Sequence, residues 1–160
     1  METFKSLVGK TIIGYCLDEN KTKLTFYTDC NRVYELYHSQ DCCESVYIED
    51  IVGDLQDLLF TPIIVAEEST SDKPSGSGEY SPLDECVLWT FYKLATQAGW
   101  VDIRWYGSSN GYYSVAVDIV CRNAEPHEID TIITARIFKE KQLLQNLPHP
   151  SNIETLVKKI

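Results

Sequence analysis

The sequence predicts an α+β protein: an antiparallel sheet of two β-meanders with a short central helix and a C-terminal amphipathic helix. Three observations lead to this class. Residues 11–38 and 86–122 form short apolar or alternating runs separated by turn residues. Residues 51–59 and 126–144 instead repeat apolar side chains at helical spacing. At 160 residues the chain is long enough to bury a core without cross-links.

The first meander is predicted from three strand-like runs. Residues 11–17 are mostly apolar, and residues 24–27 and 32–38 alternate, with polar turns at 18–21 and 29–31. A period of two places Tyr34, Leu36 and His38 on one face of the third strand. His38 is therefore expected to end a strand on the same side as two apolar residues.

The central part of the chain is expected to begin with a short helix over residues 51–59. Ile51, Leu55, Leu58 and Leu59 fall at helical spacing, in spite of Gly53. Residues 62–67 are expected to return as a strand. Residues 68–82 are rich in Ser, Gly and Pro and have no periodicity, which predicts a long mobile loop inside one domain spanning residues 1–122.

The second meander begins with residues 86–95. This run is compatible with a helix, but its strand-like neighbours favour a strand. Residues 100–106 and 112–122 are expected to pair across a turn at 107–111, because Asn110 followed by Gly111 is typical of tight hairpins. The predicted core face of this hairpin comprises Val101, Ile103, Trp105, Tyr113, Val115, Val117, Ile119 and Cys121.

The opposite face of this hairpin is polar and aromatic. It is either a binding surface or the solvated face of an antiparallel sheet, and an Arg104–Asp118 cross-strand pair explains it without a ligand. Its residues are Asp102, Arg104, Tyr106, Tyr112, Ser114 and Asp118.

Residues 123–160 are predicted to be a helical C-terminal extension of the same domain. Pro126 lies at the helix start, and residues 146–150 break the helix. Residues 151–154 offer an N-cap for a final turn. The apolar side of the helix is expected to pack on the sheet or to mediate self-association or partner docking. Its polar side holds Arg136, Lys139, Glu140 and Lys141.

The net charge of −10 is concentrated in one part of the chain. Residues 41–85 hold twelve of the 24 acidic residues and one base, Lys73. An acidic lobe argues against direct binding to nucleic acid, which requires clustered Lys and Arg, and favours a basic protein partner or solubility alone. The candidate partner-binding residues are Glu67, Glu68, Asp84 and Glu85.

The compartment is predicted from the absence of export signals. No apolar run approaches the roughly 20 residues of a membrane span, and the N-terminus lacks the pattern of a secretory signal. We therefore expect the protein to act in a cytoplasm, where its six cysteines are reduced.

The stretch from residue 38 to residue 50 concentrates metal-capable and titratable groups. His38, Asp41, Cys42 and Cys43 supply nitrogen, oxygen and sulfur ligands suited to zinc, with a further ligand such as Cys86 or Cys30 needed if one cysteine points away. Alternatively, one cysteine packs in the core, His38 bonds to Asp41 or Glu44, and the acids cap the following helix.

A catalytic role is a further interpretation of the stretch from residue 38 to residue 50. Cys42 or Cys43 as nucleophile, with His38 as base, is opposed by the surrounding carboxylates, which raise a thiol pKa. The sequence contains no phosphate-cradling glycine loop, nucleophile elbow or dinucleotide fingerprint. The sequence therefore predicts a protein that is not an enzyme.

Several motifs, in order along the chain, resemble those of a family of small phage and prophage proteins of unknown function. They are QDCCESVYIED (residues 40–50), IVAEE (64–68), WTFYKLAT (89–96) and IRWYGSSNGYYS (103–114). The resemblance covers roughly residues 6 to 121 and implies a phage-borne protein that acts inside a bacterium. It implies no catalytic residue.

Together these features predict a phage-encoded inhibitor of a bacterial defence system. Its acidic surface would bind a nucleic-acid-handling host protein, such as a CRISPR-Cas effector nuclease, whose channel is basic. One alternative is a sponge for a nucleotide-derived immune signal, which would stack a base and pair a phosphate with Arg104, Trp105, Tyr106 and Tyr112. Another is a virion or assembly protein.

Overall fold

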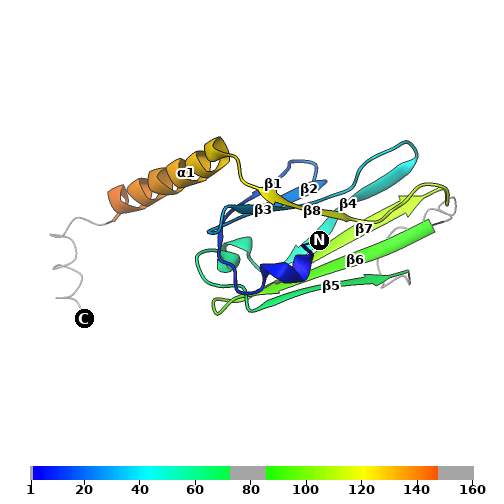
Figure 1. Cartoon of the computed structure of the whole chain (residues 1–160), viewed down its shortest axis with the longest axis horizontal. Helices are drawn as coiled ribbons and strands as arrows, with labels where there is room; N and C mark the ends of the chain where they lie inside the picture. Colours follow the sequence, from blue (N-terminus) through cyan, green and yellow to red (C-terminus); the bar gives the residue numbers. More distant parts are fainter. Residues whose placement is uncertain (1, 73–85, 148–160) are drawn as a thin grey trace. The chain divides into compact units, whose positions relative to one another are not determined.

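The computed structural model describes residues 2–72 and 86–147 and confirms the mixed α+β class. It contains two four-stranded antiparallel sheets and a C-terminal α-helix, labelled in Figure 1. The chain divides into two compact units, Met1–Ala124 and Glu125–Ile160. The first unit holds both sheets, and the second holds the helix.

The first sheet contains the predicted first meander and one strand from much later in the chain. Its order is β1-β2-β3-β8, and every neighbouring pair is antiparallel. Lys21 and Asn31 adopt positive φ in the turns that follow β1 and β2, at 57° each. The strands are β1 (Ile12–Leu17), β2 (Lys23–Thr28), β3 (Arg32–Tyr37) and β8 (Asp118–Asn123).

The second sheet has the order β4-β7-β6-β5 and is also antiparallel. Burial alternates from one residue to the next along β7: Val101, Ile103 and Trp105 are buried, and the residues between them are partly exposed. The strands are β4 (Glu44–Val52), β5 (Val65–Ser71), β6 (Cys86–Ala95) and β7 (Trp100–Ser109).

The two sheets pack face to face and enclose one apolar core, as the layers of Figure 1 show. Leu24, Phe26 and Leu36 contribute from the first sheet. Ile103 and Trp105 contribute from the second and are 0% exposed. Burial of these side chains supplies the main stabilising free energy of the fold.

Three predictions about the elements are wrong. Residues 44–52 form β4, so the predicted helix over 51–59 shrinks to the 3-10 helix η2 (Leu55–Leu58). Gly53, with φ of 99°, ends the strand, and Asp54 caps η2 by accepting from the Gln56 N–H. In addition, residues 68–71 belong to β5 and pair with β6, although a loop is predicted there; residues 73–82 of that loop lie outside the described residues.

The third correction concerns the predicted hairpin between residues 100–106 and 112–122. The strand β8 begins only at Asp118 and pairs with β3 in the other sheet, so it does not pair with β7. The chain instead folds back over the end of β7. A Cβ added at Gly107 would lie 2.6 Å from the backbone oxygen of Val115, so the absence of a side chain there allows this close passage.

The N-terminal 3-10 helix η1 (Phe4–Leu7) buries Phe4 and Leu7 in the core. The C-terminal α1 (Pro126–Gln145) begins with Pro126 at its first position and a capping box between Glu125 and Glu128. The predicted final turn over 151–154 lies outside the described residues. Within the described part of the chain, no helix combines the length and apolarity needed to cross a membrane.

Candidate functional site

The outer face of the second sheet gathers polar and aromatic side chains from all four strands. The strand register arranges them in three rows, each read in the order β4, β7, β6, β5. The first row is Tyr47, Tyr106, Trp89 and Ser71; the second is Asp50, Arg104, Phe91 and Ser69; the third is Val52, Asp102, Lys93 and Glu67. We call these twelve residues the outer face.

The second and third rows line a hollow of about 470 Å³, together with Glu68 from β5. A hollow of this size on the surface of a sheet is large enough to receive side chains of a partner. The first row lies beside it and is closely packed. The ring of Tyr106 lies 5.8 Å from that of Tyr47 and 4.8 Å, edge-on, from that of Trp89.

Arg104 lies in the middle of this face and is already compensated. Its Nε donates to Glu49 Oε2 at 2.6 Å, and its Nη2 lies 3.7 Å from Asp50 Oδ2. The register shift between Ile48 and Asp50 brings both acids beside it. The guanidinium also lies 5.4 Å from the ring centre of Trp89, within cation–π range.

The hollow therefore has an acidic balance. In the register, Lys93 lies between Asp102 on β7 and Glu67 on β5. The described residues in and beside the hollow bring together two basic and five acidic side chains, which are Arg104 and Lys93 against Glu49, Asp50, Glu67, Glu68 and Asp102. Because five carboxylates lie with only two bases, the net charge in and beside the hollow is negative.

Glu68 has a structural partner as well. It accepts a hydrogen bond from the buried Tyr92 hydroxyl at 3.2 Å. Burial raises the pKa of Tyr92 far above its ordinary value, and the Glu68 charge raises it further. The phenol consequently stays protonated and remains a donor to Glu68.

The predicted partner-binding residues lie partly in this hollow. Glu67 and Glu68 line it, whereas Asp84 and Glu85 lie outside the described residues. Asp50 is not predicted from the sequence as part of this site, and Asp102 is predicted only to lie on a face that is either a binding surface or solvated. Period two assigns Asp102 to this face, but the inter-strand register that brings it beside Lys93 is not encoded in any local pattern.

The four residues considered for nucleotide binding do not form one site. Trp105 points into the core and is 0% exposed, so the core placement predicted for it is right and base stacking on it is not possible here. Tyr112 is 84% exposed and follows the end of β7, while Arg104 and Tyr106 belong to the outer face. The predicted Arg104–Asp118 pair is also wrong, because Asp118 lies on β8 opposite Tyr37.

His38 links the two connections, β3–β4 and β7–β8, through which the chain passes between the sheets. Its segment leads from β3 to β4, and its Nδ1 lies 2.7 Å from the backbone oxygen of Ala116, in the connection from β7 to β8. Its Nε2 lies 3.3 Å from Glu44 Oε1. Glu44 also accepts from the backbone N–H groups of Asp41 and Cys42. Of the hydrogen-bonded alternative predicted from the sequence, the contact between His38 and Glu44 is present. The acids do not cap a following helix, because residues 44–52 form β4.

The charge of Glu44 is favoured by this network. Burial of its carboxyl opposes ionisation, but the N–H groups of Asp41 and Cys42 and the His38 ring outweigh it and hold the pKa of Glu44 below its ordinary value. The connection from β3 to β4 is thereby organised around one ionised side chain, and His38 links it to the connection from β7 to β8.

The cysteines differ from expectation. The structure joins Cys42 and Cys43 in a disulfide, where reduced thiols are predicted, and both residues are exposed, so neither packs in the core. Their sulfur atoms and both ring nitrogens of His38 are engaged with other atoms, so this arrangement does not fit a tetrahedral zinc site. Among residues 2–72 and 86–147 no three potential ligands come together. Zinc binding stays a prediction of the sequence, to be tested by elemental analysis.

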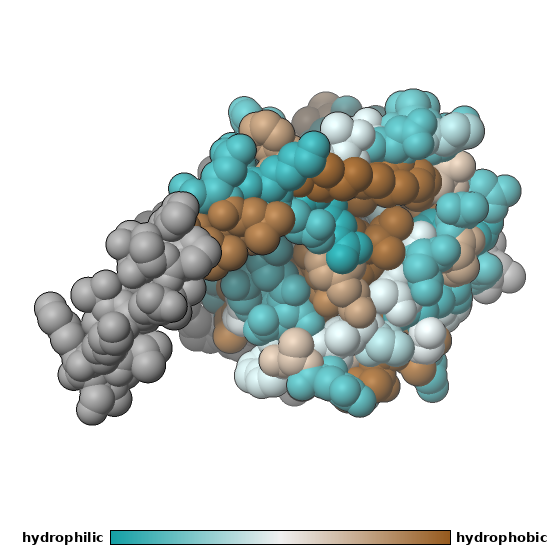
Figure 2. Space-filling view, turned by 90° about the vertical axis from the view of Figure 1, so that its left-hand side faces the viewer, coloured by the Kyte–Doolittle hydropathy of each residue, from teal (hydrophilic) through white to brown (hydrophobic). Residues whose placement is uncertain are grey.

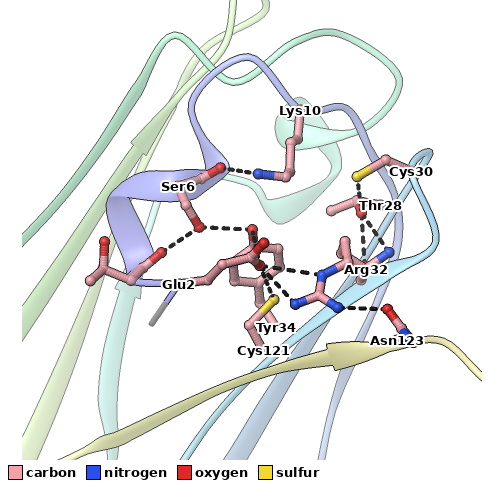
Figure 3. Close-up of polar contacts among 10 residues, drawn as sticks. Glu2, Ser6, Lys10, Thr28, Cys30, Arg32, Tyr34, Cys121 and Asn123 are labelled. Carbon is pink, nitrogen blue, oxygen red and sulfur yellow. Dashed lines mark hydrogen bonds and ion pairs between the residues drawn. The ribbon is translucent and has the colours of Figure 1, made fainter.

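A second polar cluster lies between the N-terminal segment and strands β3 and β8 of the first sheet (Figure 3). Glu2 Oε2 accepts from Arg32 Nη2 at 3.0 Å, from Cys121 Sγ at 2.6 Å and from the Tyr34 hydroxyl at 3.4 Å. Burial raises the pKa of the Cys121 thiol, and the Glu2 carboxylate raises it further. This thiol is therefore poorly suited to act as a nucleophile, and the cluster serves to tie the N-terminal segment to β3 and β8.

Comparison with curated proteins and with solved structures gives no match. A family model described as a domain of unknown function matches residues 5–119. The match runs from η1 to the first residues of β8 and thus includes the outer face and the His38 junction, whereas α1 lies beyond it. The chain accordingly belongs to the DUF7448 family.

Proposed function

We propose that this protein is a non-catalytic, phage-encoded inhibitor of a bacterial defence system, acting in the host cytoplasm. It binds a nucleic-acid-handling host protein, such as a CRISPR-Cas effector nuclease, through the carboxylates of the outer face. The observation that carries the proposal is the acidic hollow lined by Asp50, Glu67, Glu68 and Asp102.

The physical argument is charge complementarity. Nucleases hold the phosphate backbone in channels rich in Lys and Arg. Carboxylates gathered on one concave face attract such a channel, accelerate encounter at low salt and compete with nucleic acid for the same basic residues. The resemblance to small phage proteins supports a phage origin, and a phage benefits when a host nuclease is kept from its nucleic acid.

The non-catalytic part of the proposal is supported by how the reactive side chains are occupied. His38 has acceptors on both ring nitrogens, and the Cys121 thiol has a raised pKa. Neither is held as an activated base or nucleophile.

The nucleotide sponge is the second candidate, and one observation favours it: Arg104 lies within cation–π range of Trp89, on the face that also carries Tyr47 and Tyr106. A phosphate bound to Arg104 would, however, meet Glu49 and Asp50 at once. Like charges at this distance oppose each other, so the protein-binding proposal is the better supported.

The test uses purified Cas9 loaded with its guide RNA as the first basic partner, and then other nucleases of host defence systems. We expect inhibition of DNA cleavage that weakens steeply between low and high salt. The variant Glu67→Lys combined with Asp102→Lys should abolish inhibition, whereas the control Glu19→Lys, at an exposed position between β1 and β2, should preserve it. Glu68 is left unchanged in this test because it also binds Tyr92.

Inhibition that survives reversal of Glu67 and Asp102 would contradict the proposal. Heat released on titrating a nucleotide into the protein, without any inhibition of a nuclease, would instead favour the sponge. Copurification of the protein with phage particles would favour a virion or assembly role.

A further inference from the structure

The helix α1 presents apolar side chains that the described residues of its own unit, 125–147, leave exposed. None of its residues is buried along the whole of Pro126–Gln145. Figure 2 shows hydrophobic residues exposed among hydrophilic ones at the surface of the chain. The large exposed side chains are Ile133, Ile137, Phe138, Leu143, Leu144 and, just after the helix, Leu147, each between 46% and 67% exposed.

One stripe of this helix, continued by Leu147 just after its end, follows the spacing of a coiled coil. Its six positions are separated alternately by four and three residues, which is the a and d spacing of a heptad. The stripe consists of Ile129, Ile133, Arg136, Glu140, Leu143 and Leu147. Ile132 and Leu144 border it on its two edges and widen the apolar surface. Arg136 and Glu140, assigned to the polar side from the sequence alone, therefore lie at its centre.

The order of residues in this stripe reads alike from both ends. Ile129 at one end corresponds to Leu147 at the other, Ile133 corresponds to Leu143, and the two charged residues correspond to each other in the middle. When a stripe of this kind meets a copy of itself running in the opposite direction, every apolar residue faces an apolar residue. Each a position then faces a d position, as antiparallel packing requires.

We propose that α1 is a self-association element that pairs antiparallel with α1 of a second copy of this chain about a two-fold axis near residue 138. The inference is independent of the proposed function, because α1 lies outside the outer face and outside the family match. The helical part of the paired segment, from residue 129 to residue 145, is about 24 Å long at 1.5 Å per residue, and Leu147 follows it.

The two charged residues at the centre of the stripe, Arg136 and Glu140, favour a second copy of α1 as the partner and an antiparallel direction for it. Within one helix, Arg136 Nε lies 2.9 Å from Glu140 Oε1. In the antiparallel pair, Arg136 of each copy faces Glu140 of the other, so two reciprocal pairs form at the centre. A parallel pair would place Arg136 against Arg136 and Glu140 against Glu140, which is repulsive. The apolar residues drive association, and the charges fix its direction.

Sedimentation velocity of the full chain, from about 5 to 500 μM, measures the dissociation constant of the dimer. We expect Arg136→Glu and Glu140→Arg, each alone, to weaken the dimer at least about tenfold, because each places like charges at both central positions. Phe138→Ala, on the opposite side of the helix, should leave the dissociation constant unchanged. A wild-type chain that stays monomeric over this range, or an unchanged constant in Arg136→Glu, overturns the proposal.

Mixing the two single variants separates pairing between chains from pairing within a chain. Neither variant retains the pair within its own helix, but an equimolar mixture allows the opposite charges of different chains to meet. We expect the mixture to form heterodimers as stable as the wild-type dimer to within about threefold. A mixture that associates no better than the separate variants contradicts the inter-chain pairing. Circular dichroism confirms in each case that the helix is present.

The direction is tested by placing a photo-cross-linking amino acid at position 129. An antiparallel dimer gives a cross-link to the peptide of the second copy that contains Leu147. A cross-link to the peptide containing Ile129 indicates a parallel pair, and a cross-link to the sheets indicates that α1 packs on the other unit. Either of these outcomes overturns the proposal.

Discussion

The turn after β4 provides the sharpest test of how this fold is held, through the substitution Gly53→Ala. Gly53 has φ of 99°, in the region that favours glycine, and ends β4 before η2. A Cβ at this position would overlap the backbone oxygen of Trp100 and lie 3.3 Å from Val101 Cα. Both atoms belong to the start of β7, the strand that carries Asp102 and Arg104. The substitution therefore forces β4 and β7 apart at the edge of the hollow.

The magnitude follows from two costs. Holding a non-glycine residue at positive φ costs about 1–2 kcal/mol. Displacing well-packed backbone to admit a methyl group adds about 1–3 kcal/mol. Gly9 is the matched control, because its φ is 84° but nothing lies within 4 Å of an added Cβ, so Gly9→Ala bears the first cost alone.

Urea denaturation followed by tryptophan fluorescence measures both variants. We expect Gly53→Ala to lower the free energy of unfolding by about 2–5 kcal/mol and Gly9→Ala by about 1–2 kcal/mol. In a thermal melt the difference corresponds to roughly 5 °C in Tm. Equal losses in the two variants would refute the reasoning, since they would mean that the approach of Trp100 to Gly53 is not part of the native packing.

Three further predictions concern the core, the sheet junction and the free thiols. Trp105→Ala should lower the free energy of unfolding by about 3–5 kcal/mol because it leaves a cavity at the centre of the core. The control Tyr112→Ala, at an 84% exposed position, should change this free energy by less than about 0.5 kcal/mol. A large loss in the control would mean that Tyr112 has a packing role, which its exposure excludes. The folded-state pKa of Glu44 is lowered, so the stability it contributes is present above its ordinary value of 4.5 and is lost as the pH falls through the folded-state pKa. Urea denaturation from pH 7 to pH 3 should therefore show the difference between wild type and Glu44→Gln narrowing below that value, and a constant difference would argue against the network around Glu44. Alkylation with iodoacetamide at pH 8, followed by peptide mass spectrometry, should modify Cys121 more slowly than the exposed Cys16, because the pKa of Cys121 is raised; equal rates would contradict its bond to Glu2.

Local sequence patterns were sufficient for the parts of the fold that depend on neighbouring residues. The three strands of the first meander follow from period two and from polar turns. The start of α1 follows from Pro126 and the acid two residues later. The helix predicted over 51–59 failed because four apolar residues at helical spacing are also compatible with a strand end followed by a single turn of 3-10 helix.

The candidate site depended on information of a different kind. Alternation along β7 determined that Asp102 and Arg104 share a face and that Trp105 does not. It contained nothing about which strands lie beside β7, so the neighbours Glu49 and Asp50 of Arg104 were missed and Asp118 was expected in their place. An Asn-Gly pair after β7 indicates a turn, but the direction of the chain after that turn is decided by where the next strand can bury its apolar side.

The sequence by itself determined the fold class, the alternation of each strand and the acidic character of the chain, because these depend on residues close together along the chain. The tertiary structure alone decided that β8 crosses to the first sheet and that three rows of side chains meet across β4, β7, β6 and β5. It also decided that His38 links the β3–β4 connection to the β7–β8 connection. These are contacts between residues far apart in sequence. They are selected by the burial of both sheet faces against each other, a free energy that belongs to the assembled core and to no single segment.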